Sequence, residues 1–328
     1  MFENSKCINY SLKKDPSVKT SLPSLYIAKT FSLKEKPSKA ILNICGYGEG
    51  AYYINGSLIP DSFRPTIPSL ISKTVIYNSY DVTEMLKNGK NRIGIILGNY
   101  RCYKDCPLLP APMTQKVILQ LDIIYADGTN YALVSDDSFK AFESPLLFSD
   151  TTFGEIYDAR KEISGWCAPD FDDSEWFPVS EVSAPEGEFR KSDCPGVVKY
   201  DENKGVEILP GLFDFYNTTS GYVRMKISGK CGNRIKLDYS ERLTPDGMHV
   251  DMATYLKEEK PYPDMYNSAE FILNGETDKV FEALFALHGY RYVEVTGEYD
   301  NIELTAVTAH TDIIEDSSFV CDNKILNG

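Results

Sequence analysis

The stretch GYVRMKISGKCGNRIKLDYS, residues 221–240, decides the fold class. In it, two runs of alternating apolar and charged residues flank a glycine-rich turn. The apolar positions are Val223, Met225, Ile227, Ile235, Leu237 and Tyr239. Because successive side chains of a strand point to opposite faces, each run predicts a strand with one buried face. We expect Arg224, Lys226 and Lys236 to face solvent or a rim, and the two strands to form a half-buried hairpin.

The same alternation recurs along the chain. Residues 117–125 predict a strand, and Asp127-Gly128 predicts a tight turn into a second strand at residues 130–135. Short strands separated by turns are typical of antiparallel sandwiches, so we predict an all-β protein of two sandwich domains. Helices should be few and short, with candidates at residues 83–87 and from residue 323 onward.

Composition limits the partners of the protein. Its 328 residues include 22 Tyr and 16 Phe, which favour strands, and the net charge is −14. Such a surface repels polyanions, so nucleic acid and anionic membranes are poor partners. Eight cysteines are scattered, and only Cys102 and Cys106 lie close together, without the further ligands of a zinc set. The first residues do not resemble a signal peptide, which predicts a cytoplasmic protein.

A change of composition predicts the domain boundaries. Residues 183–196, SAPEGEFRKSDCPG, are polar, rich in Pro and Gly, and without alternation, as expected of a linker. We therefore predict a lead-in segment at residues 1–23, a first sandwich at 24–182 and a second sandwich at 197–312.

Carboxylates are the candidate catalytic groups that remain after other motifs are excluded. Phosphate-binding loops and a G-x-S-x-G elbow are absent from the sequence. Glu155, Asp158 and Arg160 lie close together in the sequence. We interpret Asp158 and Arg160 as a structural ion pair that fixes a loop. The alternative is that Glu155 and Asp158 are a catalytic pair of carboxylates. Trp176 ends the turn FDDSEW, residues 171–176, and either stacks on a sugar or lies buried beneath the turn; Trp166 carries the same ambiguity.

Read together, these segments resemble the bacterial α-L-rhamnosidases of glycoside hydrolase family 78. The matching stretches follow one another in family order: AYYING (51–56), YDVTEMLKNGKNRIGIILG (80–98), YADGT (125–129), GEIYDAR (154–160), GWCAPDFDDSEW (165–176), FDF (213–215) with GYVR (221–224), SERLTPDG (240–247), HGYRYVEVTG (288–297) and SSFVCDNKILN (317–327). Each is moderately specific, and their order makes the resemblance strong. The sequence departs from the family at Tyr216-Asn217-Thr218, where members carry Gly-Gln-Asn.

The resemblance implies a galactose-binding-like jelly roll followed by a larger, concanavalin-like sandwich. In the family these domains precede an (α/α)6 barrel, which holds the catalytic carboxylates in a D-C-P-x-R-[DE]-E-R signature. That signature is missing here, and Asp105-Cys106-Pro107 and Asp193-Cys194-Pro195 share only three letters with it. We therefore predict no catalytic residue in this chain, and we interpret residues 313–328 as the start of a connection to the barrel.

The resemblance also implies a sugar site on the first sandwich. In some relatives this sandwich binds rhamnose through calcium, and the corresponding positions here are Asp61, Tyr100 and Asp105. Calcium needs six to eight oxygen ligands, so backbone, water or sugar oxygens would complete the set. Ser62 stands where those relatives carry Asn, and the alternative is two solvated loop aspartates. No other cofactor is required.

Three functions are compatible with these expectations. The first is an accessory region of an α-L-rhamnosidase, with rhamnose-containing glycans and its own C-terminal catalytic domain as partners. The second is a stand-alone carbohydrate-binding, lectin-like protein. The third is a structural spacer without a ligand. The length of the native reading frame separates the first from the second, and binding of L-rhamnose separates the second from the third.

Overall fold

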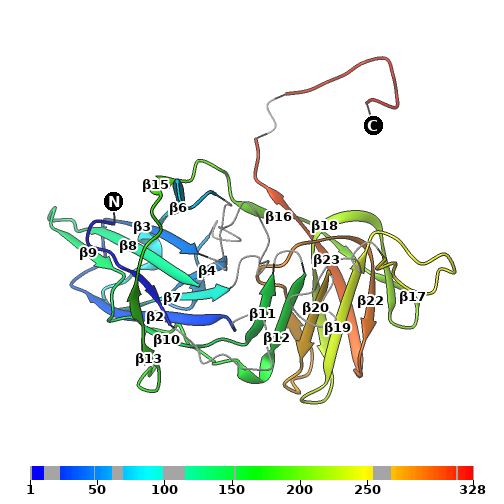
Figure 1. Cartoon of the computed structure of the whole chain (residues 1–328), viewed down its shortest axis with the longest axis horizontal. Coiled ribbons are helices and arrows are strands. Elements are labelled where there is room, and N and C mark those ends of the chain that lie inside the picture. Colours follow the sequence, from blue (N-terminus) through cyan, green and yellow to red (C-terminus); the bar gives the residue numbers. More distant parts are fainter. Residues whose placement is uncertain are drawn as a thin grey trace.

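In the part of the chain that the structure describes, the regular structure consists almost entirely of β-strands arranged in three sheets (Figure 1). The computed structural model describes residues 2–10, 23–47, 49–60, 69–98, 115–150, 153–253, 267–314 and 317–327. Within these ranges the helical elements are two 3-10 helices, η1 (Thr83–Met85) and η2 (Ala159–Lys161). The all-β prediction is therefore confirmed. The helix expected at the C-terminus is instead a turn at residues 324–326.

Two sheets pack face to face in the first sandwich. The seven-stranded sheet runs β14 (Ser180–Val182), β1 (Cys7–Asn9), β8 (Lys116–Ile124), β3 (Lys39–Tyr47), β6 (Thr74–Asp81) and β15 (Glu188–Lys191), with β9 (Asn130–Val134) also paired to β8. The six-stranded sheet runs β13 (Phe177–Pro178), β10 (Lys140–Glu143), β2 (Leu25–Leu33), β7 (Gly89–Gly98), β4 (Glu49–Ile54) and β5 (Ser57–Leu58). The hairpin predicted around Asp127-Gly128 is β8–β9.

The core of the first sandwich follows from the alternation in β8. Leu119, Leu121 and Ile123 are at most 1% exposed, and they pack in one cluster with Ile27 and Ile95 of the opposite sheet. The residues between them in β8 are only half-buried. Period-two alternation thus places one face of the strand in the core, as predicted.

A third sheet of ten strands forms the second domain. Its order is β11 (Leu146–Asp150), β12 (Gly154–Asp158), β20 (Ser268–Ile272), β19 (Arg234–Ser240), β22 (His288–Thr296), β18 (Leu212–Ser228), β23 (Asn301–Thr311) and β16 (Val197–Lys204). Two further strands, β17 (Val206–Leu209) and β21 (Lys279–Phe281), pair with β18. The sheet curves around its own core (Figure 1), which takes residues from β18 through β23.

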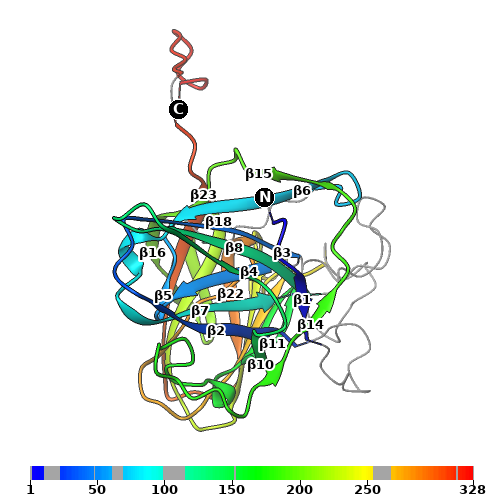
Figure 2. The same ribbon diagram turned by 90° about the vertical axis from the view of Figure 1, so that its left-hand side faces the viewer.

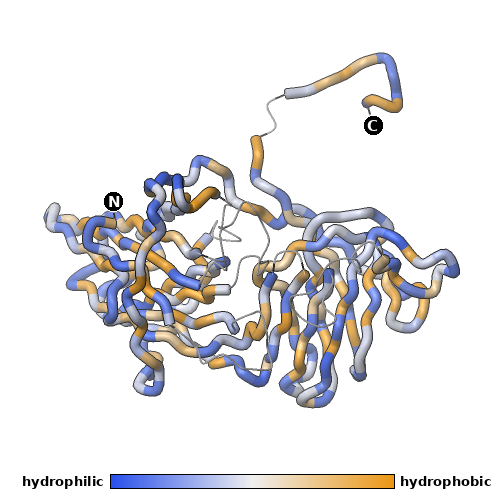
Figure 3. The backbone as a smooth tube through the Cα atoms, viewed as in Figure 1, coloured by the Kyte–Doolittle hydropathy of each residue, from blue (hydrophilic) through white to orange (hydrophobic). Residues whose placement is uncertain are grey.

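The stretch at residues 221–240 is buried as predicted but paired differently. All six of its alternating apolar residues are fully buried, and hydrophobic and hydrophilic positions alternate along these strands (Figure 3). The predicted hairpin is wrong, because β22 lies between β18 and β19. Near the turn, the edge of β18 pairs with β21 at Met225–Ile227, and both edges of β19 are taken by β20 and β22. Alternation specifies the face of a strand, not its neighbour.

The strand pairing also departs from the expected domain boundaries. β1 lies inside the expected lead-in segment, and β15 lies inside the expected linker, where it pairs in parallel with β6. β11 and β12 belong by sequence to the expected first sandwich, but β12 pairs in parallel with β20 of the ten-stranded sheet. The chain therefore enters the second domain at residues 146–158 and then returns to the first (Figures 1 and 2).

Two general features concern the described residues alone. None of their helices is long and apolar enough to cross a membrane. Their six cysteines are free thiols, of which Cys194 and Cys231 are exposed. Residues 317–327 lead away from both domains (Figures 1 and 2).

Candidate functional site

Glu155 lies at the junction of the two domains, where its carboxylate binds backbone. The side chain projects from β12 and is 1% exposed. It accepts hydrogen bonds from the backbone N–H groups of Leu284 at 2.9 Å, Ala286 at 2.6 Å and Phe285. Charged hydrogen bonds of this kind offset the cost of burying a carboxylate. Glu155 thus fastens the loop after β21 onto β12.

Asp158 and Arg160 form an ion pair at the end of the same strand. The Asp158 side chain is 3% exposed and accepts from Arg160 Nε and Nη2, each at 2.8 Å. It also accepts from the Arg160 backbone N–H at 3.1 Å, which caps η2. The hydrogen bonds from the Arg160 side chain hold the pKa of Asp158 below its ordinary value, against the effect of burial. This geometry is that of an ion pair that fixes a turn.

Trp176 is buried beneath its turn, at 6% exposure. The turn is held by Arg92 of β7, whose guanidinium carbon lies 5.3 Å from the Trp176 ring centre and 5.2 Å from that of Phe171. Arg92 also donates to Asp173 at 2.8 Å and to the carbonyl of Trp166 at 2.9 Å. Sequence reasoning missed Arg92, although a basic residue within the apolar run of β7 is a signal for a buried partner.

The structure does not test the residues that the sequence predicts to bind sugar and calcium. Asp61, Tyr100 and Asp105 all lie outside the described residues. In the part of the chain that the structure describes, no group of three or more His, Cys, Asp or Glu side chains is arranged to hold a metal ion. Of the remaining candidates, Glu155, Asp158 and Arg160 lie together on β12 and η2, whereas Trp176 packs against the six-stranded sheet.

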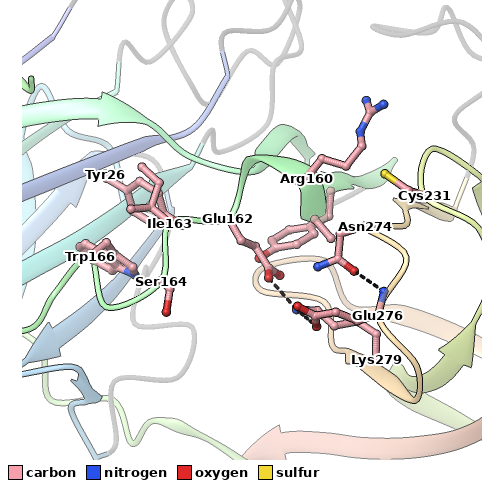
Figure 4. A pocket seen from close by; sticks show the side chains of 12 residues that line it. Tyr26, Arg160, Glu162, Ile163, Ser164, Trp166, Cys231, Asn274, Glu276 and Lys279 are labelled. Carbon is pink, nitrogen blue, oxygen red and sulfur yellow. Dashed lines mark hydrogen bonds and ion pairs between the residues drawn. The ribbon is translucent and has the colours of Figure 1, made fainter.

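A pocket of about 720 Å³ lies between the two domains (Figure 4). The first sandwich contributes Tyr26 of β2, and the end of β12 with the segment after it contributes residues from 157 to 166. Loops of the ten-stranded sheet contribute Cys231 and residues from 274 to 279. Three aromatic rings and several polar side chains therefore meet in one cavity, which is a common composition for a ligand pocket.

Hydrogen bonds order the polar side of this pocket. Glu162 pairs with Lys279 at 2.6 Å and accepts from the hydroxyl of Tyr157 at 2.9 Å (Figure 4). Lys279 also pairs with Glu276 at 3.0 Å, and the backbone N–H of Glu276 donates to Asn274 Oδ1 at 3.0 Å. Burial lowers the pKa of Lys279, but the hydrogen bonds to Glu162 and Glu276 outweigh it and raise that pKa overall.

Sequence reasoning singled out only part of this pocket. Arg160 and Trp166 belong to motifs that it recognised. Tyr26, Glu162 and Lys279 belong to no sequence pattern that predicts a binding site. They reach one another only because the segment at 146–166 crosses between the domains.

Comparison with protein families gives two matches along the chain. Residues 35–201 match the model of the α-L-rhamnosidase N-terminal domain. Residues 210–312 match the model of the bacterial α-L-rhamnosidase concanavalin-like domain. The two matches follow the order of the two β-domains.

Individual relatives agree with these matches. The chain is 28% identical to an α-L-rhamnosidase of Formosa agariphila, covering 92% of this chain and 33% of the relative. It is 31% identical to an α-L-rhamnosidase of Streptomyces avermitilis, covering 84% of this chain and 27% of the relative. The chain thus spans about a third of the length of the curated relatives it matches.

Solved structures extend the similarity to the fold. The α-L-rhamnosidase from Dictyoglumus thermophilum superposes with a TM-score of 0.84 at 29% identity, covering 99% of this chain and 38% of that one. The Streptomyces avermitilis α-L-rhamnosidase complexed with L-rhamnose gives a TM-score of 0.81 at 28% identity, covering 94% and 30%.

Proposed function

Because the chain belongs to the bacterial α-L-rhamnosidase family, as the N-terminal region with its two β-domains, we propose that it is the non-catalytic accessory region of a rhamnoside-hydrolysing enzyme. In this role it supports a catalytic domain that follows it in the full-length protein. Its ligands would be rhamnose-containing glycans, in keeping with the relative whose structure contains L-rhamnose.

The hydrogen bonding of the Glu155 carboxylate supports the proposal that this region is not catalytic. Glycoside hydrolysis requires two carboxyl groups on either side of the scissile bond, about 5–9.5 Å apart and accessible to the sugar. Glu155 is buried and accepts from three backbone N–H groups, while Asp158 is bound to Arg160. Freeing Glu155 would leave buried backbone donors unsatisfied, and freeing Asp158 would break its ion pair with Arg160, so neither is suited to proton transfer.

An activity assay tests the proposal directly. The purified chain is incubated with an aryl α-L-rhamnoside, and we expect no release of the aryl group above the buffer rate. Turnover that disappears in Glu155→Gln or Asp158→Asn would place the chemistry in a sandwich and refute the proposal. The native reading frame is expected to continue into a helical catalytic domain; a frame without one would instead favour a stand-alone lectin-like protein.

The calcium-linked sugar site on the first sandwich is a separate proposal. Asp61 and Asp105 would supply carboxylate oxygens, and Tyr100 would line the loop. Calorimetry with L-rhamnose in the presence and absence of calcium tests it. Binding that is the same with and without the ion would remove calcium from the proposal.

A further inference from the structure

We propose that the pocket between the two domains binds a neutral rhamnoside, on residues distinct from the loop aspartates Asp61 and Asp105. The choice of rhamnoside rests on the proposed function of the chain. The pocket of about 720 Å³ falls in the range of about 300–1,000 Å³ that small-molecule sites occupy. It therefore has room for more than one sugar ring.

Trp166 provides the apolar surface of this site. Its ring packs on the backbone of Gly94 in β7, where a β-carbon would lie 2.5 Å from Trp166 Cζ3. The flanking rings of Tyr26 and Tyr53 have centroids 4.4 and 5.4 Å from that of Trp166. The indole is thus fixed against the sheet while remaining partly exposed in the pocket (Figure 4). Large aromatic rings of this kind supply contact area at little cost in conformational entropy.

The charges of the pocket favour a neutral ligand. The four charged side chains among its described lining residues, Arg160, Lys279, Glu162 and Glu276, sum to zero. Each cation is already paired, Arg160 with Asp158 and Lys279 with both glutamates. An anion or a cation would have to compete with these pairs. Sugar hydroxyls both donate and accept, so they can add hydrogen bonds to the same carboxylate, amide and ammonium groups without displacing a charge.

The polar groups are ordered before any ligand arrives. Glu162 is held by Tyr157 of β12 and Lys279 of β21, and Asn274 is held by the backbone of Glu276. Gly275 occupies the left-handed region at φ +88°, which sets the tight turn between those two residues. A preorganised site loses less entropy on binding, which favours affinity for a small and flexible ligand.

The test uses the whole chain, methyl α-L-rhamnoside and EDTA, so that a calcium-linked site contributes nothing. Calorimetry should detect binding, and Lys279→Met should weaken it about tenfold, the effect of losing one charge-assisted hydrogen bond. Lys34→Met removes a more exposed ion pair, with Asp127 at 2.8 Å, outside the pocket lining, and should leave the affinity unchanged. Loss of affinity in both variants, or in neither, would overturn the assignment.

Fluorescence locates the ligand independently of folding effects. The chain has two tryptophans, and Trp176 is buried. Binding in the pocket should change the emission of Trp166, and Trp166→Phe should abolish this response while calorimetric binding persists. A response that survives in Trp166→Phe, no binding at all, or binding only with calcium would each refute the pocket. If the pocket binds no rhamnoside, the chain can still be the non-catalytic region of a rhamnosidase. Turnover of an aryl rhamnoside would refute that proposed function and would leave the binding result unchanged.

Discussion

Buried carboxylates in this chain stabilise structure through specific donors. Glu155 binds three consecutive backbone N–H groups, and Asp158 binds both the side chain and the backbone of Arg160. The two residues stand three apart in β12, a spacing that by itself is also compatible with a catalytic pair. Their donors come from a loop about 130 residues away and from an adjacent turn. The contact of Glu155 with a loop so distant in sequence cannot be recognised from the residues around Glu155.

Replacing Glu155 tests the strength of this contact. Glu155→Gln removes the charge that three N–H groups share and places an amide N–H₂ among donors. We expect the free energy of unfolding to fall by about 1.5–3 kcal/mol, the cost of disrupting hydrogen bonds to a buried charged group. Urea denaturation measures it. Glu175→Gln, at an exposed position, should change the value by less than about 0.5 kcal/mol. Equal effects in the two variants would contradict a structural role for Glu155.

The Asp158–Arg160 pair predicts a pH dependence. The pKa of Asp158 is lowered in the folded chain, so the pair stabilises above the unfolded-state pKa of about 3.9 and its contribution is lost as pH falls through the folded pKa. Asp158→Asn should therefore be less stable near neutral pH and should show a shallower loss of stability below about pH 4. Urea midpoints across this range measure it. Parallel curves for wild type and variant would show that the pair contributes nothing.

At the level of elements, the alternation of apolar and polar residues predicted which face of each strand is buried, but not which strands pair with each other. The buried faces of β8, β18 and β19 were all readable, because a half-buried strand must repeat its apolar residues every second position. The pairing of β18 and β19 with β22 depends on a strand about 50 to 80 residues further on. In the same way, the pocket combines loops that are local in space and distant in sequence. Its members within recognised motifs were visible beforehand, namely Tyr157, Ala159 and Arg160 in GEIYDAR and Trp166 in GWCAPDFDDSEW.

Gly154 controls the pairing that joins the domains. It begins β12 with φ +117°, and a β-carbon there would lie 1.6 Å from the carbonyl oxygen of Ser268 in β20. Gly154→Ala should therefore separate β12 from β20 and destabilise the chain by about 3 kcal/mol or more. Gly128→Ala is the matched control, since Gly128 also has a positive φ (+80°) but open space around it, and it should cost about 1–2 kcal/mol. Similar urea midpoints for the two variants would contradict the steric explanation.

At the level of the whole molecule, the two domains are interlocked. β11 and β12 leave the first sandwich to extend the ten-stranded sheet, and β13, β14 and β15 then return to the first two sheets. Phe285 of the second domain packs where a β-carbon on Gly98 of β7 would lie 2.6 Å from its ring. Trp176 and Tyr26 belong to the same interdomain cluster. A cut within residues 183–196 would therefore divide a continuous set of contacts.

This interlocking predicts that residues 197–328 do not fold alone. Without β12, the edge of β20 loses its partner, and the cluster of buried side chains that Phe148, Phe153 and Ile156 form is lost. Burying each of them is worth about 1.5–3 kcal/mol, comparable in sum to the stability of a small domain. Fusing residues 146–158 ahead of residue 197 restores both the strand and Glu155, and should restore a cooperative urea transition by circular dichroism. A cooperative transition in the shorter fragment, with the same midpoint as the fusion, would mean that the ten-stranded sheet is stable without its borrowed strands.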